Sequence, residues 1–161
     1  MSTDRSVELN IVSNAAGLPL VRAEVERLGR RLGFEGEDVH GLVLAIDEAL
    51  ANVIKHGYQG RENQPISVRL DLVTGADGRR GIAVQVRDRG RQVDPSAINA
   101  RKLEDVRPGG LGVYIIRTVM DDYEYSCPED GGMLLRMVKY VSQKPTKGKA
   151  GRMAARARKR R

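Results

Sequence analysis

Apolar and polar positions recur with two different periods along the first third of the chain, and each period predicts a type of element. Residues 5–12 alternate between polar and apolar side chains, which predicts an edge-type strand. Apolar residues recur every three or four positions from 18 to 32, which predicts one amphipathic helix ended by Gly33. A second helix is predicted from Gly36 to about His56, and Gly57 ends it.

The rest of the chain predicts more strands and one further helix. Strands are expected at 66–73, 81–87, 123–126 and 133–140, with a helix at 110–120. The stretch from Gly75 to Gly78 predicts the turn of a hairpin. Between Arg89 and Arg107 the periodicity is poor and charge is high, which predicts a mobile loop.

The order of these elements, β-α-α-β-β-α-β-β, indicates an α+β fold. Neighbouring strands favour antiparallel hairpins, and the helices can cover one face of the sheet. We therefore expect a two-layer α/β sandwich with a mixed, mostly antiparallel sheet and helices on one face.

Composition excludes several classes of protein. The chain has 161 residues, of which 40% are hydrophobic and 30% charged, a balance typical of globular proteins. With Cys127 as its single cysteine and only two histidines, it has neither an internal disulfide nor a Cys/His zinc cluster. The longest apolar run, Leu42–Ile46, is too short to span a membrane, and the N-terminus has no signal-peptide pattern. We expect a cytoplasmic protein that makes no membrane contact.

The net charge of +7 is concentrated at one end of the chain. Residues 144–161 carry nine basic side chains and no acidic one. Without them, 19 basic residues face 21 acidic ones, a net charge of −2. We therefore predict a folded domain at 1–143 and a disordered basic tail at 144–161. The tail has no aromatic residue for base stacking, so any nucleic-acid contact through it is expected to be nonspecific. The alternative is a tail that only keeps the protein soluble.

A first candidate site lies on the second predicted helix. Glu48 and Asn52 are four residues apart and share a face, and the small residues Gly41 and Ala45 continue that line, so another group can lie close against it. A carboxylate and an amide placed in this way can orient a hydroxyl and ligate a hard cation such as Mg²⁺. The alternative is an ordinary solvated helix face.

Two further motifs follow in the second half of the chain. Asp88 ends an apolar strand and needs a hydrogen-bond donor such as the amine of a purine, and Gly90 allows a ring to approach the backbone closely. The segment Arg107-Pro-Gly-Gly-Leu-Gly112 leads into a helix, where freed backbone amides suit an anion. The alternatives are an Asp-x-Gly turn and a plain loop.

Taken together, the three motifs resemble a known family. The segment Asp47-Glu48-Ala-Leu-Ala-Asn52-Val-Ile-Lys-His56-Gly57-Tyr58 resembles the N box of GHKL ATPases, in the form found in bacterial anti-sigma-factor serine/threonine kinases. Asp88-Arg-Gly90 resembles their G1 box and Gly109-Gly110-Leu111-Gly112 their G2 box. The resemblance covers about residues 5–140.

The resemblance implies the Bergerat ATP-binding fold, with ATP and Mg²⁺ as ligands. Asn52 would ligate Mg²⁺, and Glu48 would be the general base toward a serine hydroxyl. Asp88 would accept a hydrogen bond from the adenine amine, with Gly90 admitting the ring. The segment 89–107 would be the ATP lid, with Arg107 contacting the γ-phosphate. The residues implied to surround the phosphates are Gly109, Gly110, Leu111 and Gly112.

The chain departs from the family pattern at two positions. Gln92 stands where the fuller G1 box has a second glycine. Met133 stands near a position where family members usually carry a hydroxyl close to the nucleotide. Two further residues of the N-box segment, His56 and Tyr58, are interpreted as structural.

The resemblance implies an anti-sigma regulatory factor. Such a protein binds a sigma factor and uses ATP to phosphorylate a serine on an anti-sigma-factor antagonist, and it is a homodimer. The alternative is a nucleotide-binding module that switches partners without kinase turnover, an alternative raised by Met133. A third hypothesis is a nucleic-acid binder acting through the tail.

Overall fold

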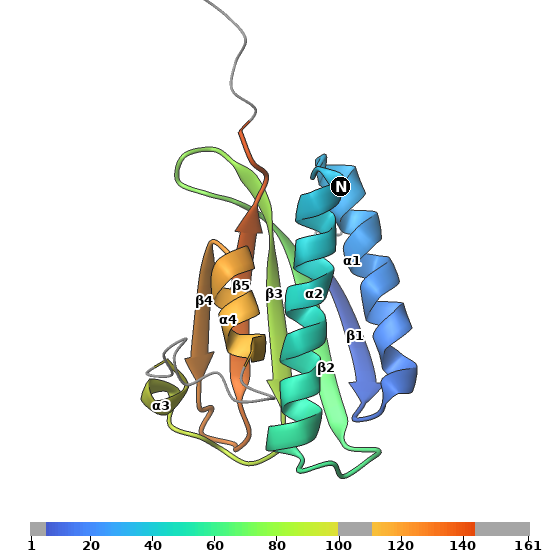
Figure 1. The fold of residues 1–161 in the computed structure, drawn as a ribbon, viewed down its shortest axis with the longest axis vertical. Coiled ribbons are helices and arrows are strands. Elements are labelled where there is room, and N and C mark those ends of the chain that lie inside the picture. Colours follow the sequence, from blue (N-terminus) through green and yellow to red (C-terminus); the bar gives the residue numbers. More distant parts are fainter. Residues whose placement is uncertain (1–5, 100–110, 144–161) are drawn as a thin grey trace, which may run out of the picture.

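The computed structural model describes residues 6–99 and 111–143 (Figure 1). The strands are β1 Ser6–Val12, β2 Pro65–Thr74, β3 Arg80–Asp88, β4 Asp122–Ser126 and β5 Leu134–Tyr140. The α-helices are α1 Leu18–Leu32, α2 Gly36–Asn52, α3 Pro95–Asn99 and α4 Leu111–Val119. A short 3₁₀ turn, Ala15–Gly17, precedes α1, and a π-helical turn, Val53–Gly57, continues α2.

The five strands form one sheet in the order β1-β2-β3-β5-β4. Every pairing of neighbouring strands among them is antiparallel. The sheet is predicted to be mixed and mostly antiparallel, and the mixed part of that prediction is wrong. The helices α1, α2 and α4 cover one face of this sheet (Figure 1). The two-layer α+β architecture is the one expected from the order of the elements.

The core lies between the helices and the covered face of the sheet. Along β3, the alternate residues Ile82, Val84 and Val86 point into it, because successive strand side chains face opposite sides. They meet the apolar stripe of α2, whose buried members include Leu42, Ile46 and Leu50. The other face is polar, and one row across all five strands reads Glu8, Arg69, Gln85, Arg136 and Glu124.

The second helix ends differently from the prediction of regular helix up to His56. After Asn52 the chain widens into the π-turn, and the amide of Tyr58 donates to the carbonyl of Val53 at 2.8 Å. Such π-turns occur frequently at functional sites. Here the wider turn directs the Tyr58 ring into the core, where it is buried.

The predicted loop at 89–107 contains a short helix, α3, which the sequence reading missed. The carboxylate of Asp94 accepts from the Ser96 amide at 2.9 Å, and Pro95 occupies the first helical position. Asp followed by Pro is a helix-start signal, but the weak periodicity beyond it hid the helix. Residues 100–110, which include Arg107, Gly109 and Gly110, lie outside the described residues, as does the tail at 144–161.

The other predicted elements are confirmed to within a few residues at each end. Gly33 ends α1 in the left-handed conformation, with φ at 84°. The hairpin at Gly75–Gly78 is closed by a hydrogen bond from the Gly78 amide to the Gly75 carbonyl at 2.9 Å. Among the described helices none has the length and apolar character needed to cross a bilayer.

Candidate functional site

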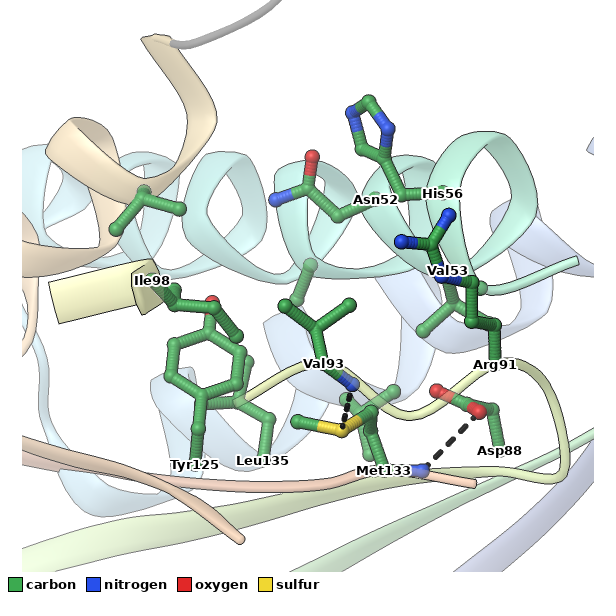
Figure 2. A pocket seen from close by; sticks show the side chains of 14 residues that line it. Asn52, Val53, His56, Asp88, Arg91, Val93, Ile98, Tyr125, Met133 and Leu135 are labelled. Atoms are coloured by element: carbon green, nitrogen blue, oxygen red, sulfur yellow. Dashed lines mark hydrogen bonds between the residues drawn. The ribbon is translucent and has the colours of Figure 1, made fainter. Parts of the chain in front are cut away.

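A pocket of about 120 Å³ lies between the end of α2, the end of β3, the start of β5 and the segment that carries α3 (Figure 2). Its walls are mostly apolar. The apolar lining residues are Ala49, Val53, Val86, Val93, Ile98, Val113, Met133 and Leu135. The polar ones are Asn52, His56, Asp88, Arg91 and Tyr125.

Asp88 provides a buried carboxylate in this pocket. The residue is 3% exposed, and its Oδ1 accepts hydrogen bonds from the amides of Gly90 at 2.8 Å and Met133 at 3.2 Å. Burial raises the pKa of the Asp88 carboxyl, and the two amide donors act against that rise. Neither amide bonds Oδ2, so this oxygen has acceptor capacity for a ligand.

The backbone around Asp88 is packed so closely that glycine is required. A Cβ on Gly90 would lie 2.4 Å from the carbonyl oxygen of Gly57, which also accepts from the Arg91 amide at 2.9 Å. A Cβ on Gly132 would lie 2.0 Å from the carbonyl oxygen of Asp88. The end of β3 is thus packed against both the π-turn that follows α2 and the residues that precede β5.

Two side chains outside the pocket hold this backbone in place. The Arg87 guanidinium donates to the Gly131 carbonyl at 2.6 Å, to the Asp130 carboxylate at 2.8 Å and to the Met133 carbonyl at 3.3 Å. The buried Tyr58 hydroxyl donates to the Pro65 carbonyl at 2.5 Å and accepts from the Arg89 amide at 2.7 Å. The interpretation of Tyr58 as a structural residue is thereby confirmed.

Glu48 and Asn52 lie together against the first turn of α4. A Cβ on Gly112 would be 2.7 Å from Oε2 of Glu48 and 3.2 Å from Nδ2 of Asn52. Farther along α2, a Cβ on Gly41 would be 3.3 Å from the side chain of Val119. The expectation that another group lies against this small-residue line is confirmed, and that group is α4. The helix start thus brings Gly112, at the end of the glycine-rich motif, to the acidic and amide side chains.

The structure therefore brings together the described members of all three sequence motifs. Asn52 and Asp88 line the same pocket, Glu48 is one helical turn before Asn52, and Gly112 contacts both α2 side chains. Gly90 lies at the edge of the pocket against Gly57, and Leu111, the first residue of α4, is exposed. Figure 2 shows Asn52, the last residue of α2, and His56, in the π-turn that follows it, above the pocket, with Asp88 below.

Several lining residues were not found from the sequence. Val93 and Ile98 belong to the segment that is predicted as a mobile loop, and Arg91 extends from its start toward the end of α2 (Figure 2). Tyr123 and Tyr125 are two residues apart and share the covered face of β4. This spacing is visible in the sequence, but it does not locate a pocket. Met133 presents its sulfur to the Val93 amide at 3.5 Å.

Comparison with known proteins agrees with the fold and the site. The family model of the histidine kinase-like ATPase domain matches residues 11–139, and the chain belongs to this family. The chain is homologous to the RsbW serine-protein kinases. It is 28% identical to that of Bacillus cereus over 149 residues, 89% of each chain. It is 27% identical to that of Halalkalibacterium halodurans over 146 residues, covering 86% of this chain and 85% of the relative.

Two solved structures share the fold. The RsbU and RsbW domains of Rv1364c from Mycobacterium tuberculosis match with a TM-score of 0.59 and 18% identity, covering 86% of this chain and 33% of that one. A chain of the SiaB–SiaC complex from Pseudomonas aeruginosa matches with a TM-score of 0.61 and 15% identity, covering 84% of this chain and 90% of that one. These findings confirm the family resemblance and the fold class predicted from the sequence.

Proposed function

We propose that this protein is an anti-sigma regulatory factor with ATP-dependent serine kinase activity. It phosphorylates a serine of an anti-sigma-factor antagonist and binds a sigma factor, as a homodimer in the cytoplasm. The observation that carries the proposal is the buried carboxylate of Asp88 in an apolar pocket that adjoins Glu48, Asn52 and Gly112. The homology of the chain to RsbW serine-protein kinases supports the same activity.

The base of ATP occupies the apolar pocket in this proposal. The second carboxylate oxygen of Asp88 accepts a hydrogen bond from the adenine amine, while Gly90 and Met133 amides hold the first. The side chains of Val53, Val93 and Leu135 are apolar surfaces suited to the faces of a flat ring. Purine recognition of this kind needs few polar groups because each is fixed in place.

The phosphates lie at the other end of the pocket, toward the start of α4. Backbone amides at a helix N-terminus favour negative charge, and Gly112 brings that end of α4 to Asn52. Leu111 and, on the resemblance, Gly109, Gly110 and Arg107 complete the phosphate contacts. No three His, Cys, Asp or Glu side chains within the described ranges are grouped to hold a metal ion.

The residues at this end of the pocket fit a metal ion that is held by one protein oxygen and by the oxygens of the phosphates. Mg²⁺ prefers oxygen ligands and often takes one or two from the protein, with the rest from phosphates and water. The amide oxygen of Asn52, beside Gly112, is the side-chain ligand that we assign to it. When bound, Mg²⁺ neutralises charge on the phosphates.

Glu48 acts as the general base in the proposed reaction. Its carboxylate accepts the proton of the substrate serine hydroxyl as that oxygen bonds the γ-phosphorus and the bond to ADP breaks. The carboxylate is only partly buried, so a protein substrate can reach it. Its contact with the Gly112 backbone fixes it one helical turn from Asn52.

The test is transfer of labelled γ-phosphate from ATP to a candidate antagonist. We expect Glu48→Gln and Asn52→Ala each to reduce labelling at least 100-fold, as is usual for a lost base or metal ligand. Glu37→Gln, in the first turn of the same helix and far from the pocket, is the matched control and should label normally. Undiminished labelling by Glu48→Gln would remove Glu48 from the proposed role.

The second candidate is a module that binds nucleotide and switches partners without turnover. Met133 favours it, because this residue lines the pocket with a thioether and offers no hydroxyl. Nucleotide binding by calorimetry, with no ADP formed over hours in the presence of the partners, would establish this candidate instead.

A further inference from the structure

Tyr125 enters the pocket from β4, a strand at the edge of the sheet. Tyr123 and Tyr125 both face the helices, opposite Met137 and Leu135 of β5. Their ring centroids are 6.2 Å apart and the rings are nearly perpendicular, at 78°. Edge-to-face contact of this kind is favourable between aromatic rings, so Tyr123 helps to fix the orientation of the Tyr125 ring.

The hydroxyl of Tyr125 is a polar group in apolar surroundings. Figure 2 shows the ring beside Leu135, with its oxygen toward Ile98. Within residues 6–99 and 111–143 no hydrogen bond to this hydroxyl is found. Burial raises the pKa of the Tyr125 phenol to about 12, so the group is neutral and able to donate at physiological pH. The Tyr125 side chain is only partly buried, so its hydroxyl is accessible to a ligand, and a ligand that covers this oxygen must replace the hydrogen bond that water otherwise supplies.

Tyr125 and Asp88 lie toward opposite ends of the pocket. Figure 2 shows Val93, Met133 and Leu135 between them. A ligand that contacts both side chains must therefore be apolar and flat in the middle and polar at two separated points. A nucleoside has this shape, because its base carries an exocyclic amine at one edge and acceptor atoms at the opposite edge and on the sugar.

We propose that the hydroxyl of Tyr125 is a second polar contact for the nucleoside, donating to an acceptor atom at the end away from Asp88. This inference rests on the proposed nucleotide binding and adds a specific residue to it. Tyr125 then contributes to nucleotide affinity through one oxygen atom, while its ring forms part of the apolar wall.

The experiment compares ADP binding by calorimetry to the wild type, Tyr125→Phe and Tyr123→Phe. Phenylalanine keeps the ring and removes only the oxygen. We expect Tyr125→Phe to bind ADP about threefold to tenfold more weakly, the usual effect of one lost hydrogen bond. Tyr123→Phe is the matched control, because Tyr123 belongs to the same strand and faces the same side but does not line the pocket, and it should bind ADP like the wild type.

The outcomes separate this inference from the proposed function. Equal ADP affinity of Tyr125→Phe and wild type would overturn the role of the hydroxyl while leaving nucleotide binding in place. Absence of ADP binding to the wild type would overturn both. Urea unfolding of Tyr125→Phe without ligand measures its fold independently, and we expect an unfolding midpoint at or above the wild-type value, because the hydroxyl has no partner to lose in the free protein.

Discussion

The two ends of the pocket are built in opposite ways. At the Asp88 end the carboxylate is buried, both neighbouring amides are hydrogen-bonded to it, and Gly90 and Gly132 allow backbone contacts that no other residue permits. At the other end, Glu48 and Asn52 are partly exposed and contact Gly112. The first end is fixed by folding itself, whereas the second keeps polar side chains accessible to ligand and partner.

This difference predicts how substitutions divide between stability and activity. Contacts at the Asp88 end belong to the β3–β5 pairing and to the π-turn that follows α2, so a change there alters both folding and nucleotide affinity. Changes at Glu48 or Asn52 remove chemistry from a surface that the core does not depend on. Variants at the two ends should therefore separate in a plot of unfolding free energy against activity.

The largest effect is expected for Gly132→Ala. Gly132 has φ at 67°, and its Cβ would lie 2.0 Å from the Asp88 carbonyl oxygen, so the β3–β5 pairing must open to admit it. We expect the free energy of unfolding in urea to fall by more than about 3 kcal/mol.

Gly131→Ala is the matched control for this variant. Gly131 also has a positive φ, 93°, but nothing lies within 4 Å of its Cβ position. It should lose only about 1 kcal/mol, the cost of a left-handed alanine. Equal losses in the two variants would show that backbone conformation, not contact with Asp88, sets the requirement.

Asp88→Asn tests the buried carboxylate and should change binding and stability in opposite directions. The asparagine carbonyl oxygen can still accept from the Gly90 and Met133 amides, but its NH₂ then points where the adenine amine should donate. We expect ADP affinity to fall about 100-fold, as when two donors meet in a buried site. Removing the buried charge should raise the unfolding free energy at pH 7, because burial penalises the charged carboxylate. Wild-type affinity in this variant would exclude Asp88 from base recognition.

The pH dependence of stability follows from the same group. Because the folded-state pKa of Asp88 is raised above its usual 3.8, the unfolded chain loses this proton first as pH rises. The wild type should therefore lose stability from Asp88 between pH 3.8 and the raised pKa. Urea titrations at several pH values should show this loss in the wild type and not in Asp88→Asn.

Much of this arrangement could be predicted from the sequence because its signals are local. The helix 18–32 was found from its apolar spacing and its glycine stop, and the three motifs were found from residues adjacent in the chain. The apolar wall of the pocket could not be found in this way. It depends on the β4–β5 register that places Tyr125 opposite Leu135, and on a short helix that carries Ile98 into the pocket. The register, and the placement of the segment that leads into this helix, are set by contacts between distant parts of the chain, such as the Val93 amide on the Met133 sulfur.

An intermediate effect is expected for Arg87→Ala. The Arg87 side chain is 18% exposed and its guanidinium holds the carbonyls of Gly131 and Met133, which positions the Met133 amide toward Asp88. We expect a loss of about 1–2 kcal/mol in unfolding free energy and severalfold weaker ADP binding.

Arg69→Ala, on the same polar face of the sheet, is the control for Arg87→Ala. Arg69 pairs with Asp71 at the exposed surface, and its loss should leave the free energy of unfolding close to the wild-type value. Stability losses of similar size in the two variants would mean that the guanidinium of Arg87 does not fix the 131–133 turn.

The smallest effect is expected for removal of residues 144–161. Two hydrogen bonds hold the last described residues. The Val141 amide donates to the Arg80 carbonyl, and the Ser142 hydroxyl donates to the Asp38 carboxylate at the start of α2. The pocket lies near the other end of this helix, where Asn52 is about 20 Å from Asp38. Charges on the tail are screened over about 8 Å at 0.15 M salt, so truncation after Gln143 should leave ADP affinity within twofold of the full chain. A larger change at that salt concentration would mean that the domain boundary at residue 143 is wrong and that the basic segment belongs to the nucleotide site.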